Sequence, residues 1–486
     1  YEVATFYAHF NIVKDSKDYN PVNVVRVCES LTCELFGAHK LLQDIKKLEN
    51  KNIKVVPGPC MGRCNVAPTV CVGKNYVDVA NFDKVKKTID EKNFDPFIPD
   101  YINLSSYKKN GGYEIANKIK NGVISKKQVL DSLNESGLKG KGGAGFPTGK
   151  KWEIVSNYNG KKYVAVNGDE GEPGTFKDRS YLESDPHRFL EGALIASYFI
   201  NAQKVYIYMR DEYPTVIKIL LDEINKMEDE EIIPKDFFIV RRGAGAYICG
   251  EESAMIESIE GKRGLPRHRP PYVAEIGLFG CPTLTNNLET LFWVRDIIEK
   301  GAKWFAEKGS NGNKGFHSFS VSGRVKNPGV KVAPAGITIQ QLIDEYCDGM
   351  ADGHTFKGYL PGGASGGILP ATMNDIPLDY GSKELMDAGC FLGSAAVVVL
   401  SDHDNMKDVA LNLLKFFEEE SCGQCTPCRS GTEKTVKLMQ EKNWNKEKLK
   451  DLSEVMAQAS ICGLGQAATN PLNSVLKYFS NEITYD

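Results

Sequence analysis

The chain has 486 residues, a formal net charge of -3 and a hydrophobic content of 42%. This length exceeds what one hydrophobic core serves, so we expect several domains. The small net charge gives no indication of a nucleic-acid partner. No apolar run is long enough to span a bilayer, and Ala395–Leu400 has the length of a buried strand. We therefore expect no direct membrane insertion. The chain begins at Tyr1 without a Met, which leaves a missing true N-terminus open.

Thirteen cysteines make an odd number, which argues against a framework built only of disulfides. Eight of them fall into two clustered sets. We expect the scattered remainder to be small buried side chains; these are Cys71, Cys249, Cys281, Cys347 and Cys390. Reduced cysteines indicate a reducing compartment, most simply the cytoplasm.

Residues 1–20 are interpreted as the end of a helical segment, and residues 21–95 as a thioredoxin-like domain. Alternating and helical hydrophobic patterns predict the order β-α-β-β-α. The expected strands and helices are Val22–Val27, Leu35–Leu48, Ile53–Val56, Thr69–Val72, Tyr76–Val79 and Phe82–Ile89.

The first cysteine set lies in loops that follow two of these strands. Its members are Cys28, Cys33, Cys60 and Cys64, spaced C-x4-C and C-x3-C. Four thiolates are what a [2Fe–2S] cluster needs, two for each iron. A structural zinc ion also takes four cysteines with similar spacing. The cluster is the favoured interpretation, and zinc is the alternative.

A polar, proline-rich linker, Asp95–Ser106, lies mostly within residues 96–315, which are expected to form a Rossmann-like α/β domain. Its first notable stretch is Gly137–Trp152, GLKGKGGAGFPTGKKW. Gly tolerates positive φ and lets backbone N–H groups approach an anion closely. The stretch contains G-x-G-x-x-G, but the preceding Ser125–Ser136 is helical in pattern rather than a strand. The ordinary dinucleotide fingerprint therefore does not apply.

Acidic and amide side chains follow the later strands of this domain. Tyr163–Val166 leads to Asn167-Gly-Asp-Glu-Gly-Glu172, whose carboxylates suit hydroxyl groups and a flavin edge better than phosphate. Lys204–Tyr208 and Phe237–Val240 are further strands, and the second leads through a Gly-rich turn to Glu251, Glu252 and a helix. Glutamates in a first helical turn compete with phosphate for the helix dipole. We expect these two near ribose or nicotinamide.

Residues 316–401 are predicted as a small domain of short strands, with Gly362–Gly367 interpreted as a turn and no chemistry of its own. Residues 402–486 have a helical pattern throughout. They carry the second cysteine set, C-x2-C-x2-C and one distant cysteine, namely Cys422, Cys425, Cys428 and Cys462. This spacing is a strong [4Fe–4S] signal, because three thiolates on one turn hold three irons and the fourth completes the cube. Zinc is the competing interpretation.

These motifs, in this order, resemble the family of flavin- and NADH-binding subunits found in respiratory complex I, NAD-reducing hydrogenases and NAD-linked formate dehydrogenases. The resemblance covers nearly the whole chain, and it implies a β-grasp fold for residues 316–401 and a helical bundle for residues 402–486. It also implies FMN, NAD(H), one [4Fe–4S] cluster and one [2Fe–2S] cluster as cofactors. Hydride transfer is the work of the flavin, so no catalytic side chain is expected.

By the same resemblance, motif by motif, FMN is expected to be held by Gly140, Lys141, Gly143, Lys151, Asn167, Asp169, Glu170, Gly250, Glu251, Asn286 and Asn287. NAD(H) is expected to contact Phe146, Glu172, Glu252 and Tyr272, with Glu172 and Glu252 positioning the nicotinamide. Many relatives have Arg where this chain has Lys141, and the two side chains differ in how they bind phosphate.

No motif for molybdenum or nickel is present, so the primary donor or acceptor is expected on a partner subunit. Gly261–Ala274 and Ser460–Ala467 most resemble the beta subunit of NAD-dependent, molybdenum-containing formate dehydrogenase. The expected partners are then a molybdenum-containing catalytic subunit and a small [2Fe–2S] thioredoxin-like subunit. The alternatives are the NADH dehydrogenase subunit of complex I and the diaphorase subunit of an NAD-linked hydrogenase. A non-catalytic electron-transfer or scaffold subunit is the alternative of another class.

Overall fold

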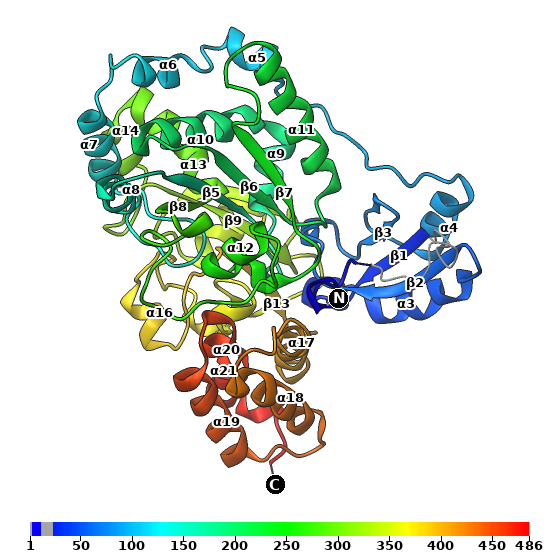
Figure 1. The fold of residues 1–486 in the computed structure, drawn as a ribbon. Helices are drawn as coiled ribbons and strands as arrows, with labels where there is room; N and C mark the ends of the chain where they lie inside the picture. The colour runs from blue at the N-terminus through cyan, green and yellow to red at the C-terminus, as the bar shows by residue number, and fades with distance from the viewer. Residues whose placement is uncertain (1, 11–22, 486) are drawn as a thin grey trace.

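The computed structural model describes residues 2–10 and 23–485, which form four regions in chain order (Figure 1). A small α/β region lies to one side of a large one, a mixed sheet lies beneath the large region, and helices complete the C-terminal end. The expected multidomain α/β fold class is confirmed. The helix predicted at the start is α1 (Glu2–Phe6). Residues 11–20 of the predicted first segment, and Val22 of the first predicted strand, lie outside the described residues.

The first region is a four-stranded sheet with the order β2-β1-β3-β4. β1 runs parallel to β2 and antiparallel to β3, as a thioredoxin-like sheet requires. Its elements are β1 (Asn23–Cys28), α2 (Leu31–Leu35), α3 (Ala38–Ile45), β2 (Ile53–Gly58), β3 (Val70–Val72), β4 (Asn75–Val77) and α4 (Phe82–Asp90). The single helix predicted for Leu35–Leu48 is wrong at its start. Gly37 has φ 84° and separates α2 from α3, a conformation that favours Gly.

The second region contains a parallel sheet with the order β7-β6-β5-β8. The strands are β5 (Tyr163–Gly168), β6 (Val205–Met209), β7 (Phe238–Arg242) and β8 (Thr283–Asn287). Helices cover both faces (Figure 1), with α10 (Pro186–Ile200) and α13 (Leu288–Lys300) on one face and α12 (Glu252–Ile259) on the other. Buried strands with both faces covered read as apolar runs, and all five residues of β6 are buried.

The remaining helices of this region surround the sheet. They are α5 (Leu104–Lys109), α6 (Glu114–Lys120), α7 (Lys126–Ser136), α8 (Thr148–Asn157), α9 (Lys177–Ser184), α11 (Pro214–Asp229) and α14 (Ala302–Ala306). The predicted linker Asp95–Ser106 is irregular only as far as Asn103, whose side chain caps α5 by accepting a hydrogen bond from the Ser106 N–H. α7 starts with a capping box formed by Ser125 and Gln128. The glycine stretch therefore follows a helix, as the sequence pattern predicts.

The third region is a mixed five-stranded sheet with the order β10-β9-β13-β11-β12. β13 (Ala396–Ser401) is central and wholly buried, and it runs parallel to β9 (Phe316–Gly323). The other elements are β10 (Gly329–Pro334), α15 (Ile339–Gln341), a π-helical turn (Leu342–Tyr346), β11 (Phe356–Leu360), β12 (Leu369–Pro370) and α16 (Lys383–Asp387). A parallel central pair with a helical crossover fits the expected β-grasp arrangement.

The last region is helical, and its helices are α17 (Met406–Glu419), α18 (Thr426–Gln440), α19 (Lys446–Ala459), α20 (Gly463–Ala467) and α21 (Asn470–Tyr478). Their apolar faces share a core with the underside of the parallel sheet, where Leu413 and Phe417 lie with Tyr206 and Ala254. The helical region is therefore packed against the α/β region rather than tethered to it.

Arg324 joins three of the four regions. From the end of β9 its guanidinium donates to the Leu35 carbonyl at 3.0 Å and to Asp404 Oδ1 at 2.8 Å. The guanidinium also lies 5.0 Å from the centroid of the Phe36 ring. One half-buried side chain thus connects the thioredoxin-like region, the mixed sheet and the start of the helical region.

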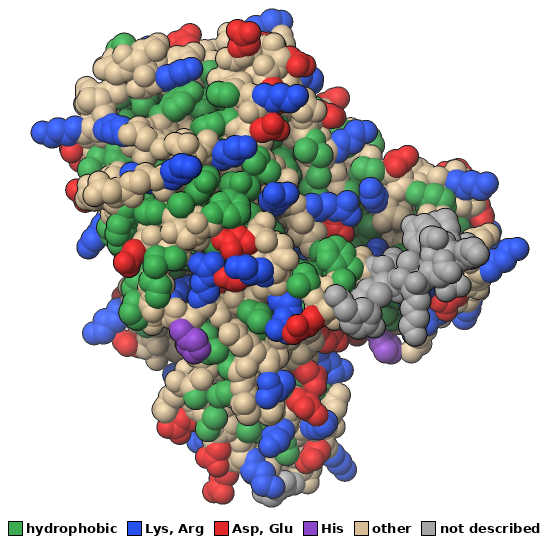
Figure 2. Space-filling model, viewed as in Figure 1, with side chains coloured by type: hydrophobic (Ala, Val, Ile, Leu, Met, Phe, Trp, Pro, Cys, Tyr) green, Lys and Arg blue, Asp and Glu red, His purple; other side chains and the backbone are tan. Residues whose placement is uncertain are grey.

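Acidic and basic side chains are interspersed over the face of the molecule shown in Figure 2, in keeping with the small net charge. Among residues 2–10 and 23–485, no helix has the length and apolar character needed to cross a membrane. Of the five scattered cysteines, four are buried as expected, and Cys281 is half-buried.

Candidate flavin and iron–sulfur sites

The candidate site lies at the carboxyl edge of the parallel sheet. β5, β6 and β7 follow one another to one side, whereas β8 lies on the other side of β5. The strand order therefore reverses between β5 and β8, and such a switch point opens a crevice beyond the carboxyl ends of the strands. The loops after β5 and β7 and the end of β8 all converge there.

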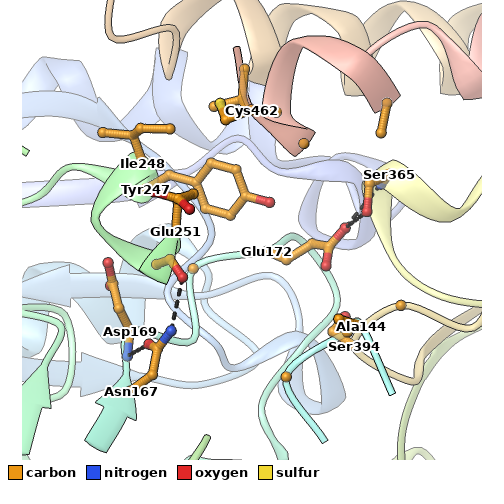
Figure 3. A pocket seen from close by; sticks show the side chains of 18 of the residues that line it. Ala144, Asn167, Asp169, Glu172, Tyr247, Ile248, Glu251, Ser365, Ser394 and Cys462 are labelled. Carbon is orange, nitrogen blue, oxygen red and sulfur yellow. Dashed lines mark hydrogen bonds between the residues drawn. The ribbon is translucent and has the colours of Figure 1, made fainter. Parts of the chain in front are cut away.

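The loop that follows β5, residues 169–176, is held in place by polar groups, and we call it the flavin loop. The Asn167 Nδ2 donates to the Gly250 carbonyl at 2.8 Å, and the Asp169 N–H donates to Asn167 Oδ1 at 3.1 Å (Figure 3). Glu172 points away from the strand, and its Oε1 accepts a hydrogen bond from the Ser365 N–H at 2.9 Å. Asn167 and Glu172 therefore anchor the loop to the β7 side and to the mixed sheet.

The glycine stretch forms a tight loop between α7 and α8. The Gly140 N–H donates to the Phe146 carbonyl at 2.8 Å. A Cβ on Gly142 would lie 3.1 Å from the Asn287 Cβ, and Gly143 has φ 124°. Backbone, not side chains, therefore faces the crevice at these two glycines.

Lys141 does not present a free ammonium to a phosphate. Its Nζ donates to the Phe316 carbonyl at 2.6 Å and contacts His317 Nδ1 at 2.9 Å. Burial lowers the pKa of Lys141 to about 8, and Glu289 and Asp379 oppose that shift. The side chain thus joins the glycine loop to the mixed sheet, although Lys141 also lines the crevice.

The other predicted lysine is also paired. Lys151 Nζ lies 3.1 Å from Glu252 Oε1 and 3.0 Å from Thr285 Oγ1. On the same strand, β8, the Asn286 Oδ1 accepts a hydrogen bond from Trp152 Nε1 at 3.0 Å. These contacts hold α8 against β8, behind the wall of the crevice.

Glu251 caps α12. Its Oε2 accepts hydrogen bonds from the N–H groups of Ser253 and Ala254 at 3.0 and 2.9 Å, and Arg269 pairs with its other oxygen. The helix therefore begins at Glu252, and Glu251 is its N-cap.

These elements enclose a cavity of about 840 Å³. The predicted residues that line it are Lys141, Gly143, Asn167, Asp169, Glu170, Glu172, Gly250, Glu251 and Asn287. The predicted residues outside its wall are Gly140, Phe146, Lys151, Glu252, Tyr272 and Asn286. Phe146 and Tyr272 are 43% and 58% exposed, so the two aromatic side chains expected at NAD(H) lie on the surface.

Asp169 gives a test of whether the cavity fits a polyhydroxylated cofactor. Its Oδ2 is buried and has no hydrogen-bond partner among the described residues. Burial raises the pKa of Asp169 well above its usual value, against the lowering effect of Arg210. A buried acceptor without a partner costs about 1–3 kcal/mol. A ribityl hydroxyl of FMN would donate the missing hydrogen bond, so the donor and acceptor groups present fit the cofactor.

The structure adds residues that the sequence interpretation missed. Ser365, Phe391, Gly393 and Ser394 of the mixed-sheet region line the cavity, so the expectation that this region has no chemistry of its own is wrong. Ser365 belongs to the Gly-rich stretch Gly362–Gly367, interpreted from its sequence as a simple turn. The sequence offers no such signal for Phe391, Gly393 and Ser394, because they reach the cavity only through folding.

A charged group in the cavity wall was also missed. Lys177 Nζ lies 2.9 Å from Asp178 Oδ1 and 3.0 Å from Glu289 Oε2, and all three side chains are buried. Tyr247, from the Gly-rich turn after β7, points into the cavity (Figure 3), and burial, together with the nearby Glu172, raises the pKa of its hydroxyl well above the usual value.

The four C-terminal cysteines surround a smaller cavity beside the first one. Cys425 is the N-cap of α18 and Cys462 that of α20, so the thiols of this set gather where helices begin. The wall of the smaller cavity includes all four cysteines: Cys422, Cys425, Cys428 and Cys462. Burial raises the pKa of the Cys428 thiol to about 11 and that of Cys462 to about 12. A cluster iron offsets this cost by binding the thiolate.

The two cavities share part of their walls. The residues common to both are Ile248, Pro266, Ile461, Cys462 and Leu464. Thus the cysteine predicted as the fourth ligand of a [4Fe–4S] cluster also lines the candidate flavin site.

The N-terminal cysteines are more deeply enclosed. Cys28, Cys33, Cys60 and Cys64 are all buried, and the Cys60 and Cys64 sulfurs are 3.4 Å apart. Hydrogen bonds from the Cys28 and Cys64 thiols lower the pKa of Cys60 well below its usual value. Four cysteine sulfurs gathered in one buried site suit a metal centre.

This second centre lies behind the flavin loop. The Gly174 backbone hydrogen-bonds to the Cys60 and Cys64 thiols, and Phe176 packs against both cysteines. Residues 171, 172 and 175 of the same loop line the flavin cavity. One loop therefore separates the two candidate redox sites.

Family models match three parts of the chain. Residues 133–296 match the Nuo51 FMN-binding domain, and residues 408–486 match the NADH-ubiquinone oxidoreductase-F iron-sulfur binding region. Residues 1–93 match the thioredoxin-like [2Fe-2S] ferredoxin. These matches agree with the three cofactor sites, and they favour iron–sulfur clusters over zinc at both cysteine sets.

The chain is also similar to named proteins over most of its length. It is 40% identical over 400 residues to the F 2 subunit of the NADH-quinone oxidoreductase of Rhizobium meliloti, covering 79% of this chain and 94% of that protein. It is 39% identical over 400 residues to the F subunit of the NADH-quinone oxidoreductase of Aquifex aeolicus, covering 79% of this chain and 91% of that protein. A chain in the crystal structure of an NAD+-reducing [NiFe]-hydrogenase in the H2-reduced state is 27% identical. It superposes with a TM-score of 0.86, covering 99% of this chain and 86% of that one.

Proposed function

Because the chain belongs to the family of NADH-quinone oxidoreductase F subunits, we propose that it reduces NAD+ with electrons from formate, which a molybdenum-containing partner subunit oxidises. The electrons pass from iron–sulfur clusters through FMN to NAD+. A small thioredoxin-like [2Fe–2S] subunit completes the proposed assembly.

The shared wall of the two cavities is the observation that carries the electron-transfer role. FMN supplies the exchange between a two-electron hydride and single electrons. The chain's part is to hold the flavin at the switch point, to exclude water from it, and to place Cys462 at its edge.

We assign the binding roles as the sequence predicts them. The residues proposed to hold FMN are Gly140, Lys141, Gly143, Lys151, Asn167, Asp169, Glu170, Gly250, Glu251, Asn286 and Asn287. Those proposed for NAD(H) are Phe146, Glu172, Glu252 and Tyr272. The exposed aromatics, Phe146 and Tyr272, would have to close over the nicotinamide nucleotide from the surface. Lys151 and Asn286 would act from behind the wall by holding α8 and β8 together.

Formate is proposed as the donor on the sequence of Gly261–Ala274, whose Arg267, His268 and Arg269 line the flavin cavity, and on Ser460–Ala467. The second candidate is the diaphorase subunit of an NAD-linked hydrogenase. It is favoured by the superposition of 99% of this chain, thioredoxin-like region included, on a chain of an NAD+-reducing hydrogenase structure.

One preparation tests these candidates. The complex is purified anaerobically through a tag on this chain, and its metals are determined. Molybdenum with formate-dependent NAD+ reduction supports the proposal, whereas nickel with hydrogen-dependent reduction supports the second candidate. A scaffold subunit would neither bleach with NADH nor reduce ferricyanide, and protein without FMN would overturn both electron-transfer assignments.

A further inference from the structure

Arg210 follows the last residue of β6, and its side chain enters the space between the flavin loop and the N-terminal cysteine site. One terminal nitrogen donates to the Glu170 carbonyl at 2.6 Å, and the other donates to the Cys60 carbonyl at 2.6 Å. Arg210 is only 4% exposed. A single guanidinium thus contacts the main chain of the flavin loop and the main chain of the loop that carries Cys60.

The charge of this group is retained although it is buried. Burial opposes the charge, but Glu212 and other neighbours hold the pKa of Arg210 well above its usual value. The Arg210 Nε lies 3.2 Å from Glu212 Oε2, and the guanidinium lies 5.1 Å from the centroid of the Tyr213 ring. Glu212 is itself ionised, since Arg210 lowers its pKa against the effect of burial.

A buried charge at this place acts on the [2Fe–2S] cluster. Reduction adds one electron, and hence one negative charge, to such a cluster. The potential of the cluster depends on the net charge and hydrogen bonds around it and on its exposure. In surroundings with little water a nearby cation favours the reduced form more strongly than it would in water. The neighbouring carboxylate has the opposite effect.

We propose that Arg210 is a positioning residue shared by two redox sites: its charge raises the midpoint potential of the [2Fe–2S] cluster, and its two carbonyl contacts fix the cluster loop against the flavin loop. The inference deepens the proposed electron-transfer role and rests on it for its meaning. The cluster potential can be measured without NADH or formate. A failure of this inference can therefore be distinguished from a failure of the proposed function.

The test is a redox titration of the purified complex, followed by electron paramagnetic resonance with dithionite and ferricyanide as titrants. Arg210→Gln should shift the [2Fe–2S] midpoint to a more negative potential, and Glu212→Gln should shift it to a more positive one. The [4Fe–4S] midpoint, measured in the same samples, should stay at the wild-type value. Arg188→Gln is the matched control, because this arginine of the same region pairs with Asp296 and stacks on Phe292 instead.

A conservative variant separates charge from position. Arg210→Lys keeps the charge but cannot hold both carbonyls with the same fork geometry. Its [2Fe–2S] midpoint should stay nearer the wild-type value than that of Arg210→Gln, while FMN should dissociate faster from both variants than from wild type.

Either half of the proposal can be overturned. The charge assignment is wrong if Arg210→Gln and Glu212→Gln both leave the [2Fe–2S] midpoint unchanged or shift it in the same direction. The positioning assignment is wrong if FMN is retained equally in all variants. Should Arg210→Gln fail to hold its cluster, Glu212→Gln alone decides the sign of the electrostatic effect.

Discussion

The two cysteine sites differ in how they meet the flavin cavity. At the C-terminal site Cys462 lies in the wall of the cavity, and three of the four cysteines are half-buried. At the N-terminal site all four cysteines are buried, and the flavin loop stands between them and the cavity. The C-terminal site is therefore both more exposed and directly adjacent to the cavity, whereas the N-terminal site is enclosed and one loop away from it.

Removal of one ligand from each site should give the largest effect. Cys462→Ser should abolish the [4Fe–4S] resonance signal and leave the [2Fe–2S] signal intact, and Cys60→Ser should do the reverse. Electron paramagnetic resonance of dithionite-reduced protein measures both. Cys281→Ser is the control, because this half-buried cysteine belongs to neither set. Loss of both signals in either variant would show that the two sites fold as one.

The two cysteine sites should lose iron at different rates. A hydrophilic chelator with a mild oxidant should bleach the [4Fe–4S] site at least about tenfold faster than the [2Fe–2S] site, because local opening is needed to reach buried thiolates. Samples quenched at successive times and analysed by electron paramagnetic resonance give the two rates. Equal rates would contradict the difference in enclosure.

Phe176 lies between the N-terminal cysteine site and the flavin cavity, and truncating it should weaken that separation. Phe176 is 1% exposed and packs on Cys60 and Cys64, so Phe176→Ala should cost about 3–5 kcal/mol of stability. Thermal unfolding measures the cost, and the [2Fe–2S] signal should also decay faster in air. Phe97→Ala, at a side chain that is 76% exposed, should change neither quantity.

A substitution at Asp169 tests whether this buried carboxylate contributes to FMN binding in the cavity. Asp169→Leu removes the buried acceptor, which should weaken FMN binding by about 1–3 kcal/mol, or roughly fivefold to 150-fold. Both cluster signals should persist. Fluorescence of released FMN on dilution gives the affinity, and Asp352→Asn, at a side chain that is 94% exposed, is the control. Unchanged affinity would remove Asp169 from the site.

The smallest effect concerns a network that touches neither cluster. Burial lowers the pKa of His317 to about 4, against the raising effect of Asp379. The unfolded chain therefore binds more protons than the folded one between about pH 6.5 and 4, so stability falls as the pH is lowered through that window. The loss at pH 5.5 is about 1 kcal/mol. Urea unfolding at pH 7 and 5.5 should show this difference, and His317→Gln should reduce it.

The sequence predicted best what depends on neighbouring residues. Spacing identified both cysteine sets, and period-two and helical patterns located nearly every strand of the first two sheets, because these patterns reflect local geometry. The broken helix at Gly37 was missed, since the amphipathic pattern continues across it while the backbone does not.

Contacts between distant segments were beyond prediction. Ser365 lies 193 residues from Glu172 in sequence, yet its N–H donates a hydrogen bond to that carboxylate. No local sequence pattern predicts such a contact. The assignments of Phe146 and Tyr272 to NAD(H) stay predictions. Lys141 shows the same limit: its neighbours in sequence suggest a phosphate ligand, but its hydrogen-bond partners are in the mixed sheet.

Arg324 has a consequence for how far electrons must travel. One guanidinium holds Leu35 and Asp404 to the same strand end, and this contact opposes independent movement of the two cysteine-bearing regions. The distances over which electrons tunnel between the redox groups would then be set when the polypeptide folds, and domain movement would not adjust them at each turnover.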